Sequence, residues 1–470
     1  MAPSEIVLSA SSSEPVLSSS SRPTSTPSIH VHDLITSAHL YAFKSSISSL
    51  NSVSYVPTQQ GTGGVVLAVQ DGKALVNVWA WQRDQILLKL HLPEKLSCFS
   101  ASPNGCWAVG GSVSGHLYLW ELASGLLLVS FNAHYRAITS LTFTSDSHLL
   151  LSASLDSSIH VFLVSRLVGN EDTGNNGKPY GTLRDHTLSV RAVTVGRTAS
   201  SSGGRCWTAS EDGTVKMWSL HPPFELLCTF SFPPSIVPTT IVVDSAERFF
   251  YVGSTQGHIY HVELFRRRAE LGMMAGEVES IGGGGPGAPP FKAEAGVISH
   301  KSSVTCLALS ISSTHLLVGT HAGDIHVHSL PSHQHLRTIL SHASPITHLS
   351  TLLRPSDLIG AGVKLDSWPV MEIKPLERMR IGKSVEDVQE VTILLRSNPH
   401  VELDTLRPLR PDQLPGVPVD AESSDKLAEL VAENKRLHAS LDRAVKINER
   451  MWNGIIDLKL AQPEGNGHAQ

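Results

Sequence analysis

One short stretch of sequence recurs along this chain and constrains its fold more than any other feature. Its clearest copy begins at Ser210 and reads Ser-Glu-Asp-Gly-Thr-Val-Lys-Met-Trp, ending at Trp218. The Asp-Gly pair is typical of a tight hairpin, and the alternation of residue types after it is typical of a strand with one buried face. The fold must therefore be built from repeated copies of one small β unit.

The recurring stretch has a period that is typical of one architecture. The positions equivalent to Trp218 in the other copies are His32, Trp79, Trp120, Phe162, Val262 and His328. Their shortest spacings are 41, 42 and 44 residues, which is the length of one four-stranded propeller blade. Seven copies predict an all-β fold, a seven-bladed WD-repeat β-propeller.

We expect the propeller to occupy residues 1–375, with flexible loops near residues 9–28, 165–180 and 266–298. The first loop is Ser-rich, and the other two contain Gly-rich polar runs that are typical of flexible segments. A propeller protects its open edge by pairing strands from the two ends of the chain. Residues 6–8 and residues 346–352 are the strand candidates for this closure, so we expect both in the first blade.

A buried polar chain is expected in the blade with the clearest copy. In WD repeats a His, a Ser or Thr, the turn Asp and the Trp are joined by hydrogen bonds. His186, Ser210, Asp212 and Trp218 hold these places here. A His, a Ser and an Asp also form the triad of hydrolases, but the repeat context favours a structural role.

The last part of the chain has a different pattern. Residues 376–422 are Pro-rich and predict an extended linker, and residues 461–470 predict a disordered tail. Residues 423–460 contain no proline, and their apolar residues alternate in steps of three and four, which predicts an α-helix that forms a coiled coil. Its seam includes Leu427, Leu430, Asn434, Leu437 and Leu441.

The polar residue within this seam indicates how the helix associates. Asn434 occupies a position where Asn fixes the register and favours two parallel strands. We therefore expect a homodimer through the C-terminal helix. The alternative is a single amphipathic helix packed on its own propeller.

Composition excludes several classes of protein. The net charge of −5 argues against a general electrostatic nucleic-acid binder. Arg266, Arg267 and Arg268 form a short basic run, which we regard as a candidate phosphate contact, with any RNA contact weak or indirect. No apolar run of about 18 residues is present, so we expect no membrane partner. The five cysteines form no CxxC pair and predict reduced thiols in an intracellular protein.

Motifs for catalysis are also missing from the sequence. The Gly-rich run at residues 282–287 is not followed by the Lys-Ser or Lys-Thr of a phosphate-binding loop. His326 and His328 lie on one face of a predicted strand, but no Cys or carboxylate at a typical spacing completes a metal site. We therefore expect no catalytic residues, no cofactor and no metal, and no enzyme.

Several stretches resemble one family. They are residues 101–105, 119–121, 124–125, 133–135, 141–143, 244–247, 251–254, 257–259, 262–265 and 446–448. Their order, the long insertion after Phe265 and the terminal helix resemble the WD-repeat subunit of the Rix complex, a nuclear assembly that matures the large ribosomal subunit. The chain departs from the pattern at Phe162, Val262 and His328 and in residues 354–420.

The resemblance implies a non-catalytic scaffold of the nucleus, in the nucleolus and nucleoplasm. It would join other Rix complex subunits, support processing of the second internal transcribed spacer and recruit the midasin ATPase to the pre-ribosome of the large subunit. A secondary role in replication licensing on chromatin is also implied. The alternative is a WD-repeat adaptor or substrate receptor of a ubiquitin ligase or signalling complex, which would need an exposed docking motif but no coiled coil.

Overall fold

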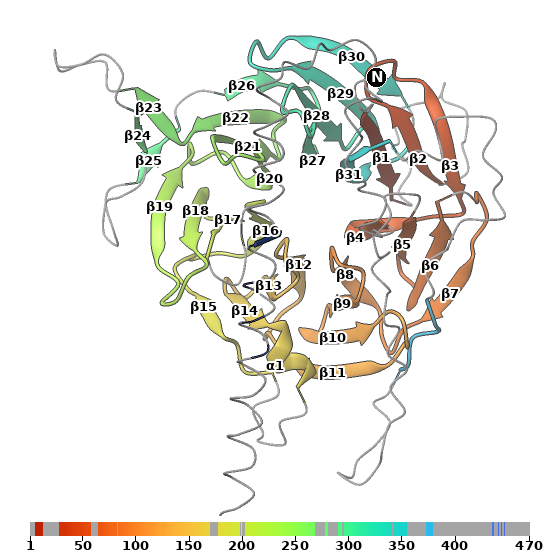
Figure 1. Cartoon of the computed structure of the whole chain (residues 1–470). Coiled ribbons are helices and arrows are strands. Elements are labelled where there is room, and N and C mark those ends of the chain that lie inside the picture. Colours follow the sequence, from red (N-terminus) through yellow and green to blue (C-terminus); the bar gives the residue numbers. More distant parts are fainter. Residues whose placement is uncertain are drawn as a thin grey trace, which may run out of the picture. The chain divides into compact units, whose positions relative to one another are not determined.

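Seven sheets, each with four antiparallel strands and one with an additional fifth strand, form a ring in the computed structural model of the chain (Figure 1). The structure describes residues 5–12, 28–57, 64–81, 83–169, 177–197, 199, 203–267, 278–280, 290–293, 296–340, 342–354 and 373–378, and residues 435, 436, 440, 443 and 446. The ring belongs to a unit of residues 1–393, and residues 394–470 form a second unit. The prediction of a seven-bladed all-β propeller is confirmed.

Six of the blades are built mainly from consecutive strands. Blades 2 to 4 consist of β4 (Ser48–Pro57), β5 (Gly64–Gln70), β6 (Leu75–Ala80) and β7 (Leu88–His91); β8 (Leu96–Ala101), β9 (Trp107–Ser112), β10 (His116–Glu121) and β11 (Leu127–Asn132); and β12 (Ile138–Phe143), β13 (Leu149–Ser154), β14 (Ile159–Leu163) and β15 (Gly181–Leu183). In each blade the first strand lies nearest the central opening (Figure 1).

Blades 5 to 7 repeat this arrangement. They consist of β16 (Val190–Val195), β17 (Arg205–Ser210), β18 (Thr214–Ser219) and β19 (Leu226–Ser231); β20 (Pro238–Val243), β21 (Phe249–Ser254), β22 (His258–Glu263) and β26 (Gly296–Ser299); and β27 (Val304–Leu309), β28 (His315–Thr320), β29 (Asp324–Ser329) and β30 (His335–Leu340). Of these three, blade 6 takes its outer strand from beyond a long insertion.

Blade 1 closes the ring with strands from both ends of the described propeller. It consists of β31 (Ile346–Leu353), β1 (Glu5–Ser11), β2 (Ser28–Asp33) and β3 (His39–Lys44). Leu8 of β1 lies opposite Ser350 on one side and opposite Val31 on the other. The predicted closure is therefore confirmed, and the last described strand completes the first blade.

The first predicted loop was placed too early in the chain. Residues 9–11 continue β1, and Ser9 and Ser11 are buried, while Ser28 begins β2. Residues 6–8 and Ala10 are fully buried, so both faces of this strand are covered and small serines fit where larger polar residues would not. Residues 13–27 lie outside the described residues.

The seven positions equivalent to Trp218 all lie on the third strand of a blade and are at most 4% exposed. Each is paired with a residue of the second strand, as Trp218 is with Cys206 and Phe162 is with Leu150. An aromatic, aliphatic or imidazole side chain can fill this place between neighbouring sheets. The period read from the sequence therefore follows one buried position around the ring.

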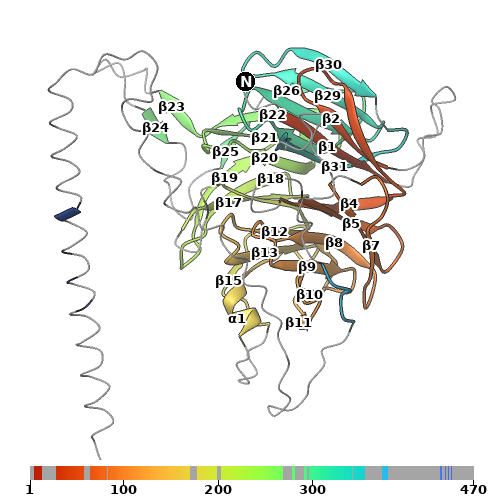
Figure 2. The same cartoon turned by 45° about the vertical axis from the view of Figure 1, so that its right-hand side comes forward.

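The other two predicted loops contain regular structure. A short helix, α1 (Val164–Val168), follows β14 and buries Val164 and Leu167 against blade 3 residues. The insertion of blade 6 contains a hairpin of β23 (Phe265–Arg267) and β24 (Val278–Ser280) near the rim at blades 5 and 6 (Figure 2). Next, β25 (Phe291–Lys292) pairs in parallel with β19. Residues 296–298 belong to strand β26 because Ile298 completes the apolar cluster between blades 6 and 7, so the prediction of a loop there is wrong.

Residues 373–378 return to the propeller and dock on blade 3. Leu376 is buried in the cluster between blades 2 and 3. The Lys374 amide donates to the Leu122 carbonyl at 3.3 Å, and the Glu377 amide donates to the Gly125 carbonyl at 2.8 Å. The buried Trp120 indole donates to the Glu377 carbonyl at 3.0 Å. The predicted boundary at 375/376 is therefore wrong, because this docked segment crosses it.

We expect Gly125→Ala to release this docked segment. Gly125 has a φ of +76°, and an added Cβ would lie 2.2 Å from the Pro375 carbonyl oxygen. The substitution should raise amide hydrogen exchange across residues 373–378, measured by mass spectrometry. It should also lower stability by more than backbone strain alone, because Trp120 loses its acceptor and Leu376 is exposed.

Gly72→Ala is a matched control for this substitution. Gly72 has a similar φ of +70° but no atom within 4 Å of an added Cβ. It should cost about 1–2 kcal/mol from backbone strain alone and leave exchange at residues 373–378 unchanged. Equal exchange in both variants would contradict the docking.

The second unit is described at five positions only. Lys435, Arg436, Ser440, Arg443 and Lys446 are helical and exposed. The predicted seam residues Leu427, Leu430, Asn434, Leu437 and Leu441 lie outside the described residues, as do the rest of the linker and the tail. Within the described parts of the chain, no helix has the length and apolar character to cross a membrane. The five cysteines are free thiols.

Candidate interaction surfaces and buried hydrogen-bond chains

A continuous hydrogen-bond chain crosses the interior of blade 5. The Nδ1 atom of His186 lies 3.0 Å from Asp212 Oδ2, and its Nε2 atom lies 2.7 Å from Thr208 Oγ1. The Trp218 indole donates to the same Thr208 hydroxyl at 3.0 Å. Three of the four residues predicted for this chain, His186, Asp212 and Trp218, are thus brought together.

The fourth prediction, Ser210, is wrong. The Ser210 hydroxyl donates to the Leu188 carbonyl and accepts from the Asp212 amide, so it supports the turn. Thr208 takes its place because it lies two residues farther from the turn on the same strand. There it is opposite Lys216 and within reach of both rings. Thr208 and Ser210 are two residues apart on one strand face, so alternation alone does not distinguish them.

Blade 4 carries a three-residue version of the chain. His134 lies 3.0 Å from Asp156 Oδ2 and 2.7 Å from Ser152 Oγ. Phe162 stands at the Trp position and cannot donate to the serine. In blade 1 the corresponding pair is His342 and Ser9, with Nε2 and Oγ 2.9 Å apart. Each pair ties the entry loop of a blade to its second strand.

The connectivity of His186 resembles a catalytic triad, but its environment excludes that use. The His186 side chain is fully buried and Thr208 is fully buried, so no substrate can reach the hydroxyl. Burial alone would raise the pKa of Asp212, but hydrogen bonds from His186 and Thr214 hold that pKa well below its usual range. The carboxylate therefore stays charged and anchors the loop. The role of this hydrogen-bond chain is therefore to stabilise the blade.

Thr208→Val is expected to lower the free energy of unfolding by about 1–3 kcal/mol. The substitution conserves shape but leaves His186 Nε2 and the Trp218 indole without their shared partner in the interior. Urea unfolding followed by fluorescence would measure the change. Thr182→Val, at an exposed position of β15, should change stability little. An unaltered midpoint for Thr208→Val would contradict the structural role.

Blade 7 offers the reciprocal substitution. Val318 lies opposite His326 as Thr208 lies opposite Lys216. The buried Nε2 atom of His300 has no hydrogen-bond partner among the described residues. Val318→Thr should supply that partner and raise the free energy of unfolding by about 1 kcal/mol. A loss of stability of the same size would mean that the His300 ring cannot use a hydroxyl there.

A cavity of about 750 Å³ opens at one end of the central channel. Its walls are formed by the innermost strands and the loops before them. Many of its hydroxyl groups connect neighbouring blades: Ser97 Oγ donates to the Ile138 carbonyl, Thr139 Oγ1 to the Val190 carbonyl and Thr239 Oγ1 to the Val304 carbonyl. These hydroxyls hold the ring together and are already engaged.

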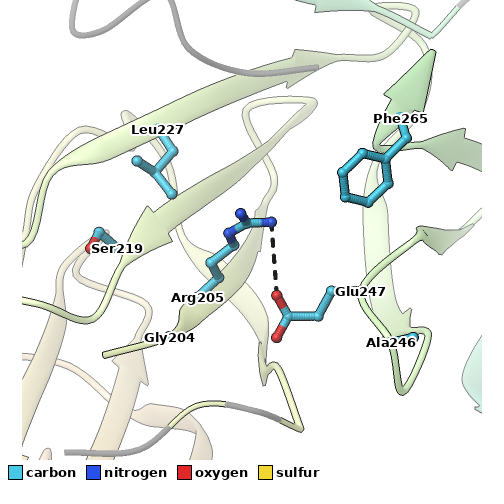
Figure 3. Close-up of a pocket in the computed structure, with 7 residues that line it drawn as sticks. All are labelled: Gly204, Arg205, Ser219, Leu227, Ala246, Glu247 and Phe265. Atoms are coloured by element: carbon cyan, nitrogen blue, oxygen red, sulfur yellow. Dashed lines mark ion pairs between the residues drawn. The ribbon is translucent and has the colours of Figure 1, made fainter. Parts of the chain in front are cut away.

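A second, smaller pocket of about 390 Å³ lies between blades 5 and 6 (Figure 3). Arg205 and Glu247 face each other across it, with 3.8 Å between Nη1 and Oε2. Leu227 and Phe265 supply apolar surface. The lining residues include no histidine or cysteine, and the one carboxylate faces an arginine. The arrangement provides a shallow contact surface and no acid–base pair for catalysis.

The predicted basic run follows the pocket residue Phe265 in the sequence. Arg266 and Arg267 belong to β23, where Arg266 pairs with Glu279, and Arg268 lies outside the described residues. Across the described part of the chain, no group of three or more His, Cys, Asp or Glu side chains could hold a metal ion.

Comparison with known proteins supports the reading of the repeats. A family model described as WDR54 matches residues 30–176, and the model of the WD domain, G-beta repeat, matches residues 177–219. These matches cover the first five copies of the recurring stretch.

Relatives with printed functions are similar over most of the propeller. The chain is 32% identical to the pre-rRNA-processing protein IPI3 of Mycosarcoma maydis, over 70% of this chain and 66% of that protein. It is 34% identical to the protein of the same name from Yarrowia lipolytica, over 68% of this chain and 72% of the relative. It is 30% identical to WD repeat-containing protein 18 of Homo sapiens, over 67% of this chain and 70% of that protein. With its seven blades, the chain belongs to the family of WD-repeat pre-rRNA-processing proteins that includes IPI3 and WD repeat-containing protein 18.

Proposed function

We propose that this protein is a non-catalytic scaffold subunit of the Rix complex and acts in pre-rRNA processing and maturation of the large ribosomal subunit. The observation that carries the proposal is its similarity, at 32–34% identity over about 70% of the chain, to relatives named for pre-rRNA processing. The rigid ring and the burial of its His–Asp–hydroxyl chains support a binding role over a catalytic one.

The proposed partners follow from the same family. The protein joins other Rix complex subunits in the nucleolus and nucleoplasm, supports processing of the second internal transcribed spacer and helps to recruit the midasin ATPase to the pre-ribosome. RNA is contacted weakly or through partners, with Arg266, Arg267 and Arg268 as the candidate phosphate contact. A role in replication licensing is a secondary proposal.

The C-terminal helix is proposed to join two copies of the chain. The seam of Leu427, Leu430, Asn434, Leu437 and Leu441 supports this, because Asn at such a position favours a parallel pair. Two propellers on one stalk would give the complex paired binding surfaces and increased avidity.

Affinity purification of the tagged full chain from nuclei tests the proposed function. Mass spectrometry should identify Rix complex subunits and midasin, and sequencing of bound RNA should recover precursors that contain the second internal transcribed spacer. Thr182→Val serves as a folded control. Recovery of ubiquitin-ligase subunits without precursor RNA or assembly factors would favour the alternative adaptor and contradict the proposal.

A further inference from the structure

The connections of blades 2 to 5 form one continuous surface around the 750 Å³ cavity. In an antiparallel blade, the loop that enters the first strand and the turn between the second and third strands lie at the same end. The close approach of the Gly115 turn to the His134 loop shows this contact, since the His134 amide donates to the Gly115 carbonyl at 3.2 Å. Leu50 and Val113 line the cavity at this end.

Large apolar side chains are exposed on this surface. Leu50, Val113, Tyr135 and Leu188 are between 51% and 95% exposed, and Tyr135 is the most exposed of them. Tyr135 and Leu188 belong to the loops that lead into β12 and β16, beside the cavity-lining residues Ala137 and Arg191. Two of the four residues line the cavity and the other two lie on loops that continue into its wall, and exposed apolar residues beside a cavity are typical of a protein-binding site.

The loops that present Tyr135 and Leu188 are held by the buried chains of their blades. The Tyr135 amide donates to Asp156 Oδ2, and the Thr187 amide donates to Asp212 Oδ2, both at 3.2 Å. The same carboxylates bind His134 and His186. The surface is therefore ordered before a partner arrives, which lowers the entropic cost of binding.

Two cations of this surface have no acidic partner among the described residues. Arg136 and Arg184 are exposed and form no ion pair within the described residues. The acidic side chains of these loops are already engaged: Asp185 pairs with Lys216 and Glu211 pairs with Arg191. Likewise, Glu94 accepts from Tyr118, while Asp156 and Asp212 face inward to their histidines.

We propose that this surface, formed by Leu50, Val113, Tyr135, Arg136, Arg184 and Leu188 and called here the channel-mouth surface, binds an acidic peptide segment of a partner protein. The segment inserts aliphatic or aromatic side chains among the four apolar residues, and its carboxylates contact the two arginines. The inference rests on the proposed function, because it names the kind of partner that the scaffold holds.

A protein segment fits this surface better than RNA does. Three of the cavity hydroxyls that could contact a nucleotide are already engaged between blades. The surface has four apolar side chains and only two arginines that form no ion pair within the described residues. Sites for single-stranded RNA instead combine several aromatic platforms with a basic groove. Tyr135 is the one aromatic residue on the channel-mouth surface.

Selection from a random twelve-residue peptide library displayed on phage, with the purified full-length protein as bait, tests the proposal. Peptides enriched on the wild-type protein should be net acidic and contain Leu, Phe or Trp. Their affinity, measured by fluorescence anisotropy, should fall at least tenfold in Tyr135→Ala with Leu188→Ala, and also in Arg136→Glu with Arg184→Glu.

Matched controls lie away from the channel mouth. Ile35→Ala with Leu336→Ala removes two exposed apolar side chains, and Arg83→Glu with Lys89→Glu reverses two exposed cations. Both should bind the selected peptides as the wild type does. Lack of enrichment, enrichment of neutral or basic peptides, or equal binding by the Tyr135 and Leu188 variant would overturn the proposal.

A parallel binding experiment with RNA tests the competing class of ligand. Tighter binding of a twelve-nucleotide oligouridine than of any selected peptide, lost in the arginine variant alone, would also overturn the proposal. No pre-ribosomal component enters these experiments, so their failure would leave the proposed role in pre-rRNA processing untouched, and failure of that role would leave the peptide site intact.

Discussion

Lowering the pH from 7 to 5 is expected to destabilise the propeller by several kcal/mol, through histidines of blade 1, which closes the ring, and of the neighbouring blade 7. Burial, together with the neighbouring His39, lowers the pKa of His30 to about 4, and burial with His30 and His39 does the same for His32 in blade 1. In blade 7, burial and neighbouring histidines lower the pKa values of His300 and His328 to about 4.

The sign of the effect follows from proton binding. Each of these histidines has a pKa near 6.5 in the unfolded chain and near 4 in the folded one. Between these values the unfolded state binds more protons, so stability is complete above about pH 6.5 and falls as the pH approaches 4. The rings reach solvent in part, so each contributes about 1–2 kcal/mol rather than the full value of its shift.

The ring contacts explain why protonation is unfavourable here. The His30 ring lies 4.7 Å from the His342 ring, and the His300 ring is stacked 4.4 Å from the His326 ring. Two charged imidazoles at these distances would repel each other without water between them. Because blade 1 joins β1 to β31, its loss opens the ring, and the whole propeller should unfold in one transition.

A paired variant tests which residues are responsible. His32→Phe with His328→Phe places at these positions the residue that Phe162 provides in blade 4, and it should reduce the loss of stability between pH 7 and pH 5, measured by urea unfolding. His91→Gln with His321→Gln removes two exposed histidines and should leave the pH profile unchanged. Stability that stays flat down to pH 4.5 in the wild type would refute the role of the histidines.

The carboxylates of the buried chains act in a different pH window. The hydrogen bonds that hold the pKa values of Asp156 and Asp212 below their usual range keep both side chains charged throughout this interval. Their contribution is lost only as the pH falls below about 4. A decline that begins near pH 6.5 therefore precedes the loss of these two carboxylates and reports the histidines.

Much of the ring could be predicted from sequence because one buried position repeats in every blade. A side chain at the Trp218 position must fill the space between two sheets, so its apolar or imidazole character persists even where Trp itself is replaced. The closure by β1 and β31 could be predicted for the same reason, since an unpaired edge strand must find a partner. These features depend on local patterns that recur.

Features that depend on a single distant contact could not be predicted in this way. Leu376 is one apolar residue in a Pro-rich segment, and its partners in blades 2 and 3 lie more than 200 residues earlier in the chain. Thr208 was missed because Ser210 shares its strand face and stands next to the turn. The sequence does not predict the strand β26, because an insertion separates it from the rest of its blade.

The largest effect of any substitution is expected at the C-terminal helix. Leu430→Asp with Leu437→Asp should convert the full-length protein from a dimer to a monomer, because each pair of helices would bury four carboxylates in one apolar seam. Sedimentation velocity at several concentrations would measure the change. Thermal unfolding of the propeller should be the same in both proteins, since the seam lies outside residues 1–393.

Asn434 gives the same experiment a second and more specific readout. Two asparagines in one layer of a parallel pair can hydrogen-bond each other and fix the register, at some cost in stability. Asn434→Leu should therefore raise the thermal stability of the dimer and permit higher oligomers, whereas a helix packed on its own propeller would gain stability but remain monomeric. Residues 1–420 should sediment as a monomer under all conditions. A monomeric full-length protein would show that the seam is covered by the propeller or by another protein, and the avidity expected of two linked propellers would then have to come from a different subunit.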